Sequence, residues 1–132
     1  MSRRLAREKI LQCLFGITVG NNNLETALEY FQEEDISKVD MEFIDNAVNG
    51  VIKHLTEIDA FYAPFLKDWQ PERIANVDRT ILRMAVYEIR YLSDIPVTVS
   101  INEAVELAKI FGGDEAPKFI NAVLDQVKNA TV

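Results

Sequence analysis

The spacing of apolar residues along the chain constrains its fold more than any other feature of the sequence. These residues recur at steps of three and four, the period of one face of an α-helix, and not in the alternation typical of β-strands. Only five glycines and four prolines interrupt the 132 residues. The sequence therefore predicts an all-α fold, with helices over about residues 3–19, 24–33, 41–55, 57–66, 77–92, 100–111 and 115–127.

Polar residues and glycine mark where several of these helices are expected to begin or end. Four side chains are predicted to cap a helix start by accepting a backbone N–H: Asp40, Asn76, Ser100 and Asp114. Glu103 gives Ser100 the spacing of a capping box. Gly112 is expected to end a helix in the left-handed conformation, and Pro64 to kink or break one near Ala63.

Length and cysteine content indicate one intracellular domain. A chain of 132 residues buries enough surface to fold without disulfides, and we expect an N-terminal helical part over about 1–68 and a C-terminal part over about 74–128. The single cysteine, Cys13, lies in an apolar helical pattern, which favours a core position in a reducing compartment over a reactive thiol. No segment has the length of a membrane span or the pattern of a signal peptide, so we expect a soluble, cytoplasmic protein.

No motif or residue pattern typical of an enzyme active site is evident in the sequence. It contains no P-loop, no glycine-rich dinucleotide motif and no Cys/His set for zinc. The only histidine, His54, falls in the apolar third helix, where a structural role is more common than one as a ligand or base. Glu88 lies beside an apolar stripe and is also expected to be structural, hydrogen-bonded to a neighbour. We therefore expect neither catalysis nor a cofactor or metal.

The charge distribution points to an anion near the N-terminus. Residues 1–9 have a balance of +3 on a chain whose net charge is −7. Cations in the first turns of a helix oppose its dipole, an unfavourable placement that a bound phosphate would reverse. Arginine also stacks on unpaired bases, which favours single-stranded RNA over a duplex. A solvated basic end without any ligand remains the alternative.

Five motifs in a fixed order carry a family resemblance. They are VDRTILRMAVYE at 77–88, DIP at 94–96, INEAVELAK at 101–109, FG at 111–112 and KFINAVLD at 118–125. Together with the arginine-bearing first helix, this set resembles the NusB family. The resemblance covers essentially the whole chain and is weakest between residues 20 and 65.

The resemblance implies a fold of about seven helices in two packed bundles and a role in transcription antitermination. Family members bind boxA RNA of ribosomal RNA operons together with NusE, a small-subunit ribosomal protein, and dock on RNA polymerase with other Nus factors. By position, the implied RNA contacts are Arg3, Arg4, Arg7, Phe65, Arg83, Lys118 and Phe119. The implied contacts to a partner are Phe15, Asp78 and Glu115.

Some alternatives remain open at this point. Phe119 also lies on the apolar side of the last helix, so core packing is an equal possibility. Leu5 interrupts the arginines, and Ala116-Pro117 precedes Lys118 where relatives more often have polar residues, so the isolated chain is expected to bind RNA weakly. A homodimer, or a piece of a ribosomal RNA cytosine methyltransferase carrying a NusB-like domain, are the competing interpretations.

Overall fold

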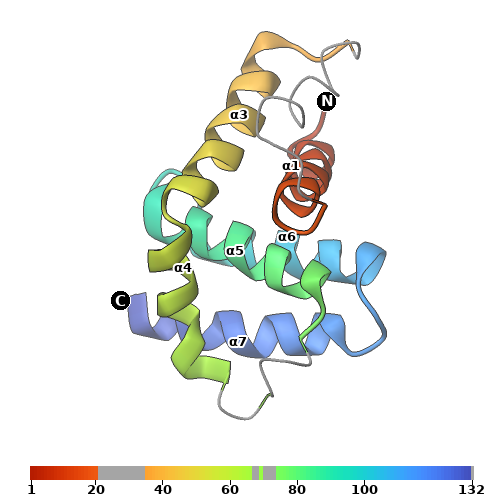
Figure 1. Ribbon diagram of the computed structural model, residues 1–132. Helices are drawn as coiled ribbons and strands as arrows, with labels where there is room; N and C mark the ends of the chain where they lie inside the picture. The colour runs from red at the N-terminus through yellow and green to blue at the C-terminus, as the bar shows by residue number, and fades with distance from the viewer. Residues whose placement is uncertain (21–34, 67–68, 70–73, 132) are drawn as a thin grey trace. The chain divides into compact units, whose positions relative to one another are not determined.

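A computed structural model describes residues 1–20, 35–66, 69 and 74–131. Within these ranges the chain forms six α-helices and one short 3-10 helix, and no strand (Figure 1). The all-α prediction is confirmed, and the helix expected at about 24–33 lies outside the described residues. The chain divides into two compact units, Met1–Lys53 and His54–Val132, so the predicted division at about 68–74 falls inside the second.

The first unit contains two helices that pack on each other, α1 (Arg3–Thr18) and α3 (Lys38–Lys53). The shared core consists of Ala6, Ile10, Leu11, Cys13 and Leu14 from α1 and Ile44, Ala47, Val48 and Val51 from α3. Cys13 is therefore the core residue that its apolar surroundings predicted.

Serine side chains cap both helices of this unit. Ser2 Oγ accepts the N–H of Leu5 at 3.1 Å, and Ser37 Oγ accepts the N–H of Asp40 at 3.2 Å. The prediction that Asp40 caps its helix is wrong, because the helix begins two residues earlier and places Asp40 in the first turn. An acidic residue there still suits the positive end of the helix dipole.

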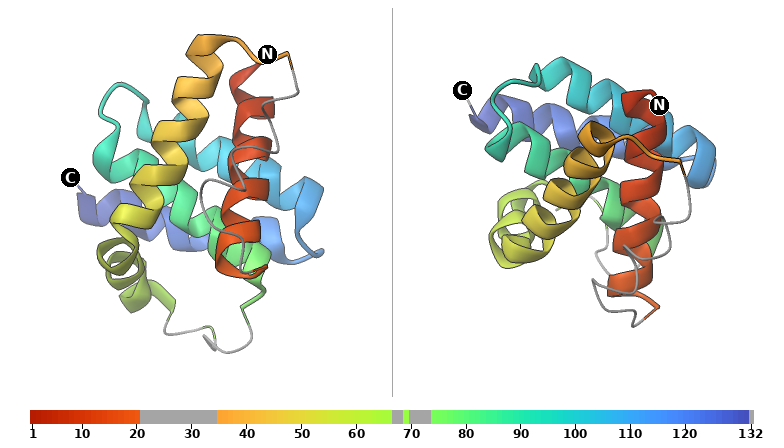
Figure 2. Two further views of the ribbon diagram at one scale, coloured as in Figure 1. Left: turned by 45° about the horizontal axis from the view of Figure 1, so that its top comes forward. Right: turned by 90° about the horizontal axis from the view of Figure 1, so that it is seen from above.

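The second unit contains α4 (Leu55–Tyr62), the 3-10 helix η1 (Ala63–Leu66), α5 (Asn76–Tyr91), α6 (Val97–Phe111) and α7 (Ala116–Thr131). Helices α5, α6 and α7 pack against one another, and α4 packs against α5 and α7 (Figures 1 and 2). Helix α5 lies at the centre, with nine buried residues. Helix α4 ends at Tyr62 and Pro64 is the second residue of η1, so the break predicted near Ala63 is confirmed.

The starts of α5, α6 and α7 differ from the sequence-based expectation. Asn76 is the first residue of α5 and the cap position is Ala75. Ser100 lies inside α6, which begins at Val97, so the predicted capping box is not formed. Helix α7 begins two residues after Asp114, which is not its cap, and it carries Pro117 in its first turn as predicted.

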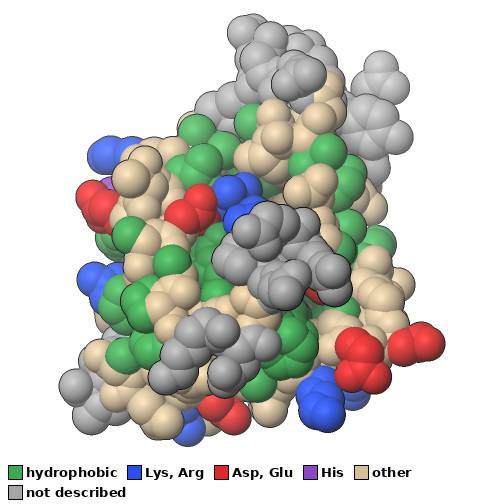
Figure 3. Space-filling view, turned by 60° about the horizontal axis from the view of Figure 1, so that its bottom comes forward, with side chains coloured by type: hydrophobic (Ala, Val, Ile, Leu, Met, Phe, Trp, Pro, Cys, Tyr) green, Lys and Arg blue, Asp and Glu red, His purple; other side chains and the backbone are tan. Residues whose placement is uncertain are grey.

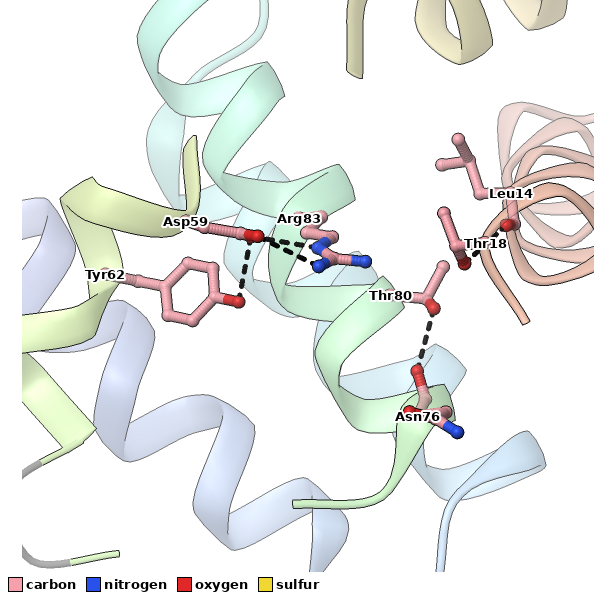
Figure 4. Close-up of polar contacts among 7 residues, drawn as sticks. All are labelled: Leu14, Thr18, Asp59, Tyr62, Asn76, Thr80 and Arg83. Carbon is pink, nitrogen blue, oxygen red and sulfur yellow. Dashed lines mark hydrogen bonds and ion pairs between the residues drawn. The ribbon is translucent and has the colours of Figure 1, made fainter. Parts of the chain in front are cut away.

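A buried polar group explains why Ser100 does not cap a helix. Ser100 Oγ donates to Glu88 Oε1 at 2.9 Å, so the hydroxyl satisfies a buried carboxylate instead of a helix end. The structural role predicted for Glu88 is confirmed. Thr80, also buried, donates to the carbonyl oxygen of Asn76 at 2.7 Å (Figure 4).

Two further predictions are corrected by backbone geometry. Gly112 ends α6 with φ −94° and ψ 176°, which is extended and not left-handed. Glycine is needed there for space, because a Cβ would lie 2.5 Å from the Cβ of Ala116 and 2.8 Å from the carbonyl oxygen of Ala108. His54 is not inside α3: it separates α3 from α4 and stacks on Tyr91, with ring centroids 4.3 Å apart.

Candidate nucleic-acid interface

The start of α1 presents arginine side chains against an aromatic ring of α3. The guanidinium carbon of Arg3 lies 3.9 Å from the centroid of the Phe43 ring, and that of Arg7 lies 5.8 Å from it. Arg3 and Arg4 are exposed, whereas Arg7 is 4% exposed. Both distances are within the range of a cation–π contact. The ring therefore gathers two of the three predicted N-terminal RNA contacts.

In the same unit, Asp40 forms an ion pair with the α-amino group of the chain. The α-amino group of Met1 lies 3.2 Å from Asp40 Oδ2, and Ser37 Oγ donates to the same oxygen at 2.9 Å. The hydrogen bond from Ser37 lowers the pKa of Asp40, and the hydrogen bond and charge of the amino group lower it further. The carboxylate of Asp40 is thus ionised at neutral pH and hydrogen-bonded to these two donors.

Arg83 of α5 is held by a carboxylate within the second unit. Its Nε and one terminal nitrogen donate to the two oxygens of Asp59 in α4, each at 2.9 Å, and the hydroxyl of Tyr62 donates to Asp59 Oδ1 at 2.9 Å. Figure 4 shows both donors directed at this one carboxylate. Burial alone would lower the pKa of Arg83, but the hydrogen bonds and charge of Asp59 outweigh it and raise the pKa. Two of five guanidinium donors therefore serve to join α4 to α5.

The remaining predicted RNA contacts come from η1 and α7, which pack on each other. Phe65 is half-buried in η1, and Lys118 is exposed in the first turn of α7. Phe119 is 5% exposed and meets the ring of Trp69 edge-on, with centroids 4.7 Å apart. Its position is that of a core residue, which was the alternative to a stacking surface.

The predicted partner contacts are Phe15, Asp78 and Glu115. Phe15 is half-buried on α1, and Glu115 is exposed immediately before α7. Asp78, in the first turn of α5, has a buried Oδ1 without a hydrogen-bond partner, and burial raises the pKa of its carboxyl group. This oxygen would lie 3.1 Å from a Cβ at position 112, so Asp78 reaches the α6–α7 turn, close in sequence to Glu115.

Basic side chains are dispersed on one face of the molecule. On the face drawn in Figure 3, lysines and arginines stand in several separate groups among hydrophobic and acidic side chains. In the part of the chain that the structure describes, no three His, Cys, Asp or Glu residues are placed to hold a metal ion. None of its helices is long and apolar enough to cross a bilayer.

Sequence reasoning missed Phe43 as a site residue. Its sequence position places this residue in the predicted third helix, and the sequence does not indicate a role beside the arginines. The contact depends on how α1 packs against α3, about 40 residues away in sequence. An aromatic residue near the start of a helix was the only local signal, and it does not identify its neighbour.

Comparison with known proteins assigns the family. The family model described as the NusB family matches residues 4–129. The chain belongs to the NusB family. The NusB proteins of Bacillus subtilis (strain 168) and Bacillus pumilus (strain SAFR-032) are each 49% identical to it over 129 residues, which is 98% of this chain and 96% of the relative.

Solved NusB structures share the fold. The structure of T. maritima NusB is 33% identical, with a TM-score of 0.89, and the match covers 98% of this chain and 92% of that one. A structure of the antitermination factors NusB and NusE in complex with dsRNA is 27% identical, with a TM-score of 0.85 and coverage of 97% and 96%. The Bacillus relatives are named transcription antitermination proteins. The expected family is confirmed, and so is the expectation of a transcription factor and not an enzyme.

Proposed function

We propose that this NusB-family chain is an antitermination factor that binds boxA RNA of ribosomal RNA operons jointly with NusE. In this role it supports processive elongation by RNA polymerase together with other Nus factors. The names of the relatives and the solved complex of NusB and NusE with dsRNA support the proposal. The observation that carries it on this chain is the exposed guanidinium of Arg3 beside Arg4 at the positive end of α1. Transcription in bacteria takes place in the cytoplasm, where this function requires the protein to be.

Charge explains why a partner is part of the proposal. With a net charge of −7, the chain as a whole repels RNA, and only a local group of cations attracts it. A basic ribosomal protein would add positive charge and would suit acidic contacts such as Asp78 and Glu115. The isolated chain is therefore expected to bind boxA RNA weakly, and its complex with NusE to bind it well.

The predicted contact residues are expected to have different roles, depending on their exposure and on the residues around them. Arg3, Arg4 and Lys118 are exposed and are suited to phosphates, and Phe65 is suited to stacking on a base. Arg83 and Phe119 are expected to act mainly by holding the second unit together, because of Asp59 and Trp69 respectively. Phe15 is expected to contact NusE through its exposed part.

A fluorescence anisotropy titration with labelled boxA RNA, with and without NusE, tests this function. If the chain neutralises three to five phosphates, log K should fall against log salt with a slope of about −2 to −3.5. Replacing Arg3, Arg4 and Arg7 by alanine should weaken binding and flatten the slope. The matched control carries alanine at three other basic positions whose side chains are exposed, Lys53, Arg90 and Lys128. Its net charge changes by the same amount.

The control separates a specific site from general attraction. If both triple variants lose the same RNA affinity, Arg3, Arg4 and Arg7 contribute only through the net charge of the protein. Equal affinity for boxA RNA with and without NusE, or for boxA and a scrambled RNA, would contradict the proposed function itself.

A further inference from the structure

We propose that Phe43 is a positioning residue of the RNA site: its ring holds the guanidinium groups of Arg3 and Arg7 at the start of α1. The inference rests on the proposed function, which supplies the RNA. It concerns only the first unit, within which all three side chains lie. Its basis is the pair of contacts at 3.9 Å and 5.8 Å from the ring centroid.

Whether an arginine can bind a phosphate depends on the side chain that already contacts its guanidinium group. Asp59 holds Arg83 through two hydrogen bonds of 2.9 Å, and such a carboxylate offsets the positive charge and competes with a phosphate for the N–H groups. An aromatic ring attracts the cation through its quadrupole and takes no hydrogen bond from the edge of the group. Phe43 therefore orients Arg3 and leaves its charge and N–H donors for an RNA phosphate.

Asp40, the acidic residue in this region, does not orient the arginine side chains as the ring of Phe43 does. Asp40 interacts with Arg3 through charge, but its hydrogen bonds come from Ser37 and the α-amino group. These bonds draw the first residues of the chain toward the start of α3. The ring of Phe43 then fixes the direction of the arginine side chains that follow.

The burial of Phe43 agrees with a role outside the core. The core face of α3 is made of Ile44, Ala47, Val48 and Val51, which are at most 6% exposed, whereas Phe43 is half-buried at the edge of this face. A residue needed only for packing would gain by full burial. The ring instead remains where side chains from α1 reach it.

The size of the expected effect follows from preorganisation. Fixing Arg3 before RNA binds removes part of the ordering cost of binding. The gain in affinity cannot exceed the free energy of the contact, so loss of the ring should weaken RNA binding by about two- to fivefold through Arg3, the exposed arginine that it orients.

The test measures boxA RNA binding by the complex of the full chain with NusE. Phe43→Leu removes the ring and keeps an apolar side chain, while Phe43→Tyr keeps the ring. The matched control is Phe61→Leu, which removes an equivalent contact: Arg90 lies 4.0 Å from the Phe61 ring. We expect Phe43→Leu to lose affinity, Phe43→Tyr to retain it and Phe61→Leu to bind as the wild type.

A double-mutant cycle distinguishes positioning from a general structural role. In a background of Arg3→Ala and Arg7→Ala, the Phe43→Leu change should alter affinity by less than about twofold, because there is no guanidinium left to position. A loss of the same size in both backgrounds would overturn the inference. NMR of the free protein gives a second readout, in which Phe43→Leu should remove the ring-current shift of the Arg3 side-chain signals.

The outcomes also separate this inference from the proposed function. If the wild-type complex binds boxA RNA through the arginines and Phe43→Leu binds equally well, the inference fails and the function stands. If the wild-type complex shows no preference for boxA RNA, the proposed function fails. The NMR result is independent of RNA binding. If the Arg3 signals keep the same ring-current shift in Phe43→Leu, the contact between Arg3 and the Phe43 ring is contradicted.

Discussion

Ser100 of α6 donates a hydrogen bond of 2.9 Å to Glu88 of α5, and both side chains are at most 5% exposed. A buried carboxylate is costly unless donors satisfy it, so the hydroxyl offsets part of that cost. The bond has one favourable geometry, and it therefore also specifies how α6 is aligned along α5. A polar pair thus helps to define the core of the second unit.

Removing the hydroxyl should destabilise the protein. Ser100→Ala is expected to lower the free energy of unfolding by about 1–3 kcal/mol, because Glu88 loses a donor in a buried place. Urea denaturation followed by circular dichroism measures the change. The control is Ser93→Ala at an exposed turn position, for which a change within about 0.5 kcal/mol is expected. Similar midpoints for both variants would show that the buried bond contributes little.

The α6–α7 turn depends on a glycine for space. Gly112→Ala would place a methyl group 2.5 Å from the Cβ of Ala116 and 2.8 Å from a backbone oxygen of Ala108, so the turn must shift. We expect a loss of about 1–3 kcal/mol of stability, as for other overpacked sites. Gly113→Ala is the control, because an added Cβ meets no atom within 4 Å there. Equal melting temperatures for the two variants would contradict the steric argument.

Stability at alkaline pH should report the burial of Cys13. Burial raises the pKa of its thiol from 9.0 to about 12, although the charge of Lys9 opposes this. Between these values the unfolded chain loses the proton and the folded chain keeps it, so the free energy of unfolding falls as pH rises. The contribution of this one thiol should be about 1 kcal/mol between pH 8 and pH 10. Urea denaturation at both pH values should show a smaller fall for Cys13→Ala, and an unchanged fall would contradict this assignment.

Asp78 should reduce the stability of the isolated chain at neutral pH. Burial raises the pKa of its carboxyl group above 3.8, so the folded state favours the protonated form more than the unfolded state does. The resulting penalty is present at neutral pH and declines as pH falls through the raised pKa. Asp78→Asn should therefore be more stable than the wild type at pH 7, and this advantage should shrink on acidification. Asp94→Asn, at an exposed position, is the control and should show no such trend in urea denaturation.

Periodicity predicted the helices because a helix that packs on a core must repeat its apolar residues along one face. In α5, Ile81, Met84, Ala85 and Ile89 recur at steps of three and four and are buried, and Val77 at the start of the same stripe is half-buried. The helix starts were harder to predict, because a serine or asparagine suits a cap and also suits other hydrogen bonds. Ser100 shows this ambiguity: its local pattern is that of a cap, but its partner is Glu88, twelve residues earlier.

The candidate site was predictable in its chemistry but not in its contacts. Arginines near the start of a first helix indicate an anion site whatever their surroundings. The burial of Arg7, the ring under Arg3 and the carboxylate that holds Arg83 all depend on packing between helices. Asp59 and Arg83 are 24 residues apart, and no local pattern relates them. The roles of the ten predicted contacts in RNA or partner binding remain predictions.

Because Cys13 is buried, the protein is suited to fluorescent labelling at chosen surface positions. This residue is the only cysteine in the chain, it is 3% exposed, and its thiol stays protonated at the pH used for maleimide coupling. Fluorophores would therefore attach selectively to cysteines engineered on the surface. One dye on each compact unit would allow energy transfer to measure the separation of the units in solution and any change in it when NusE and RNA are added.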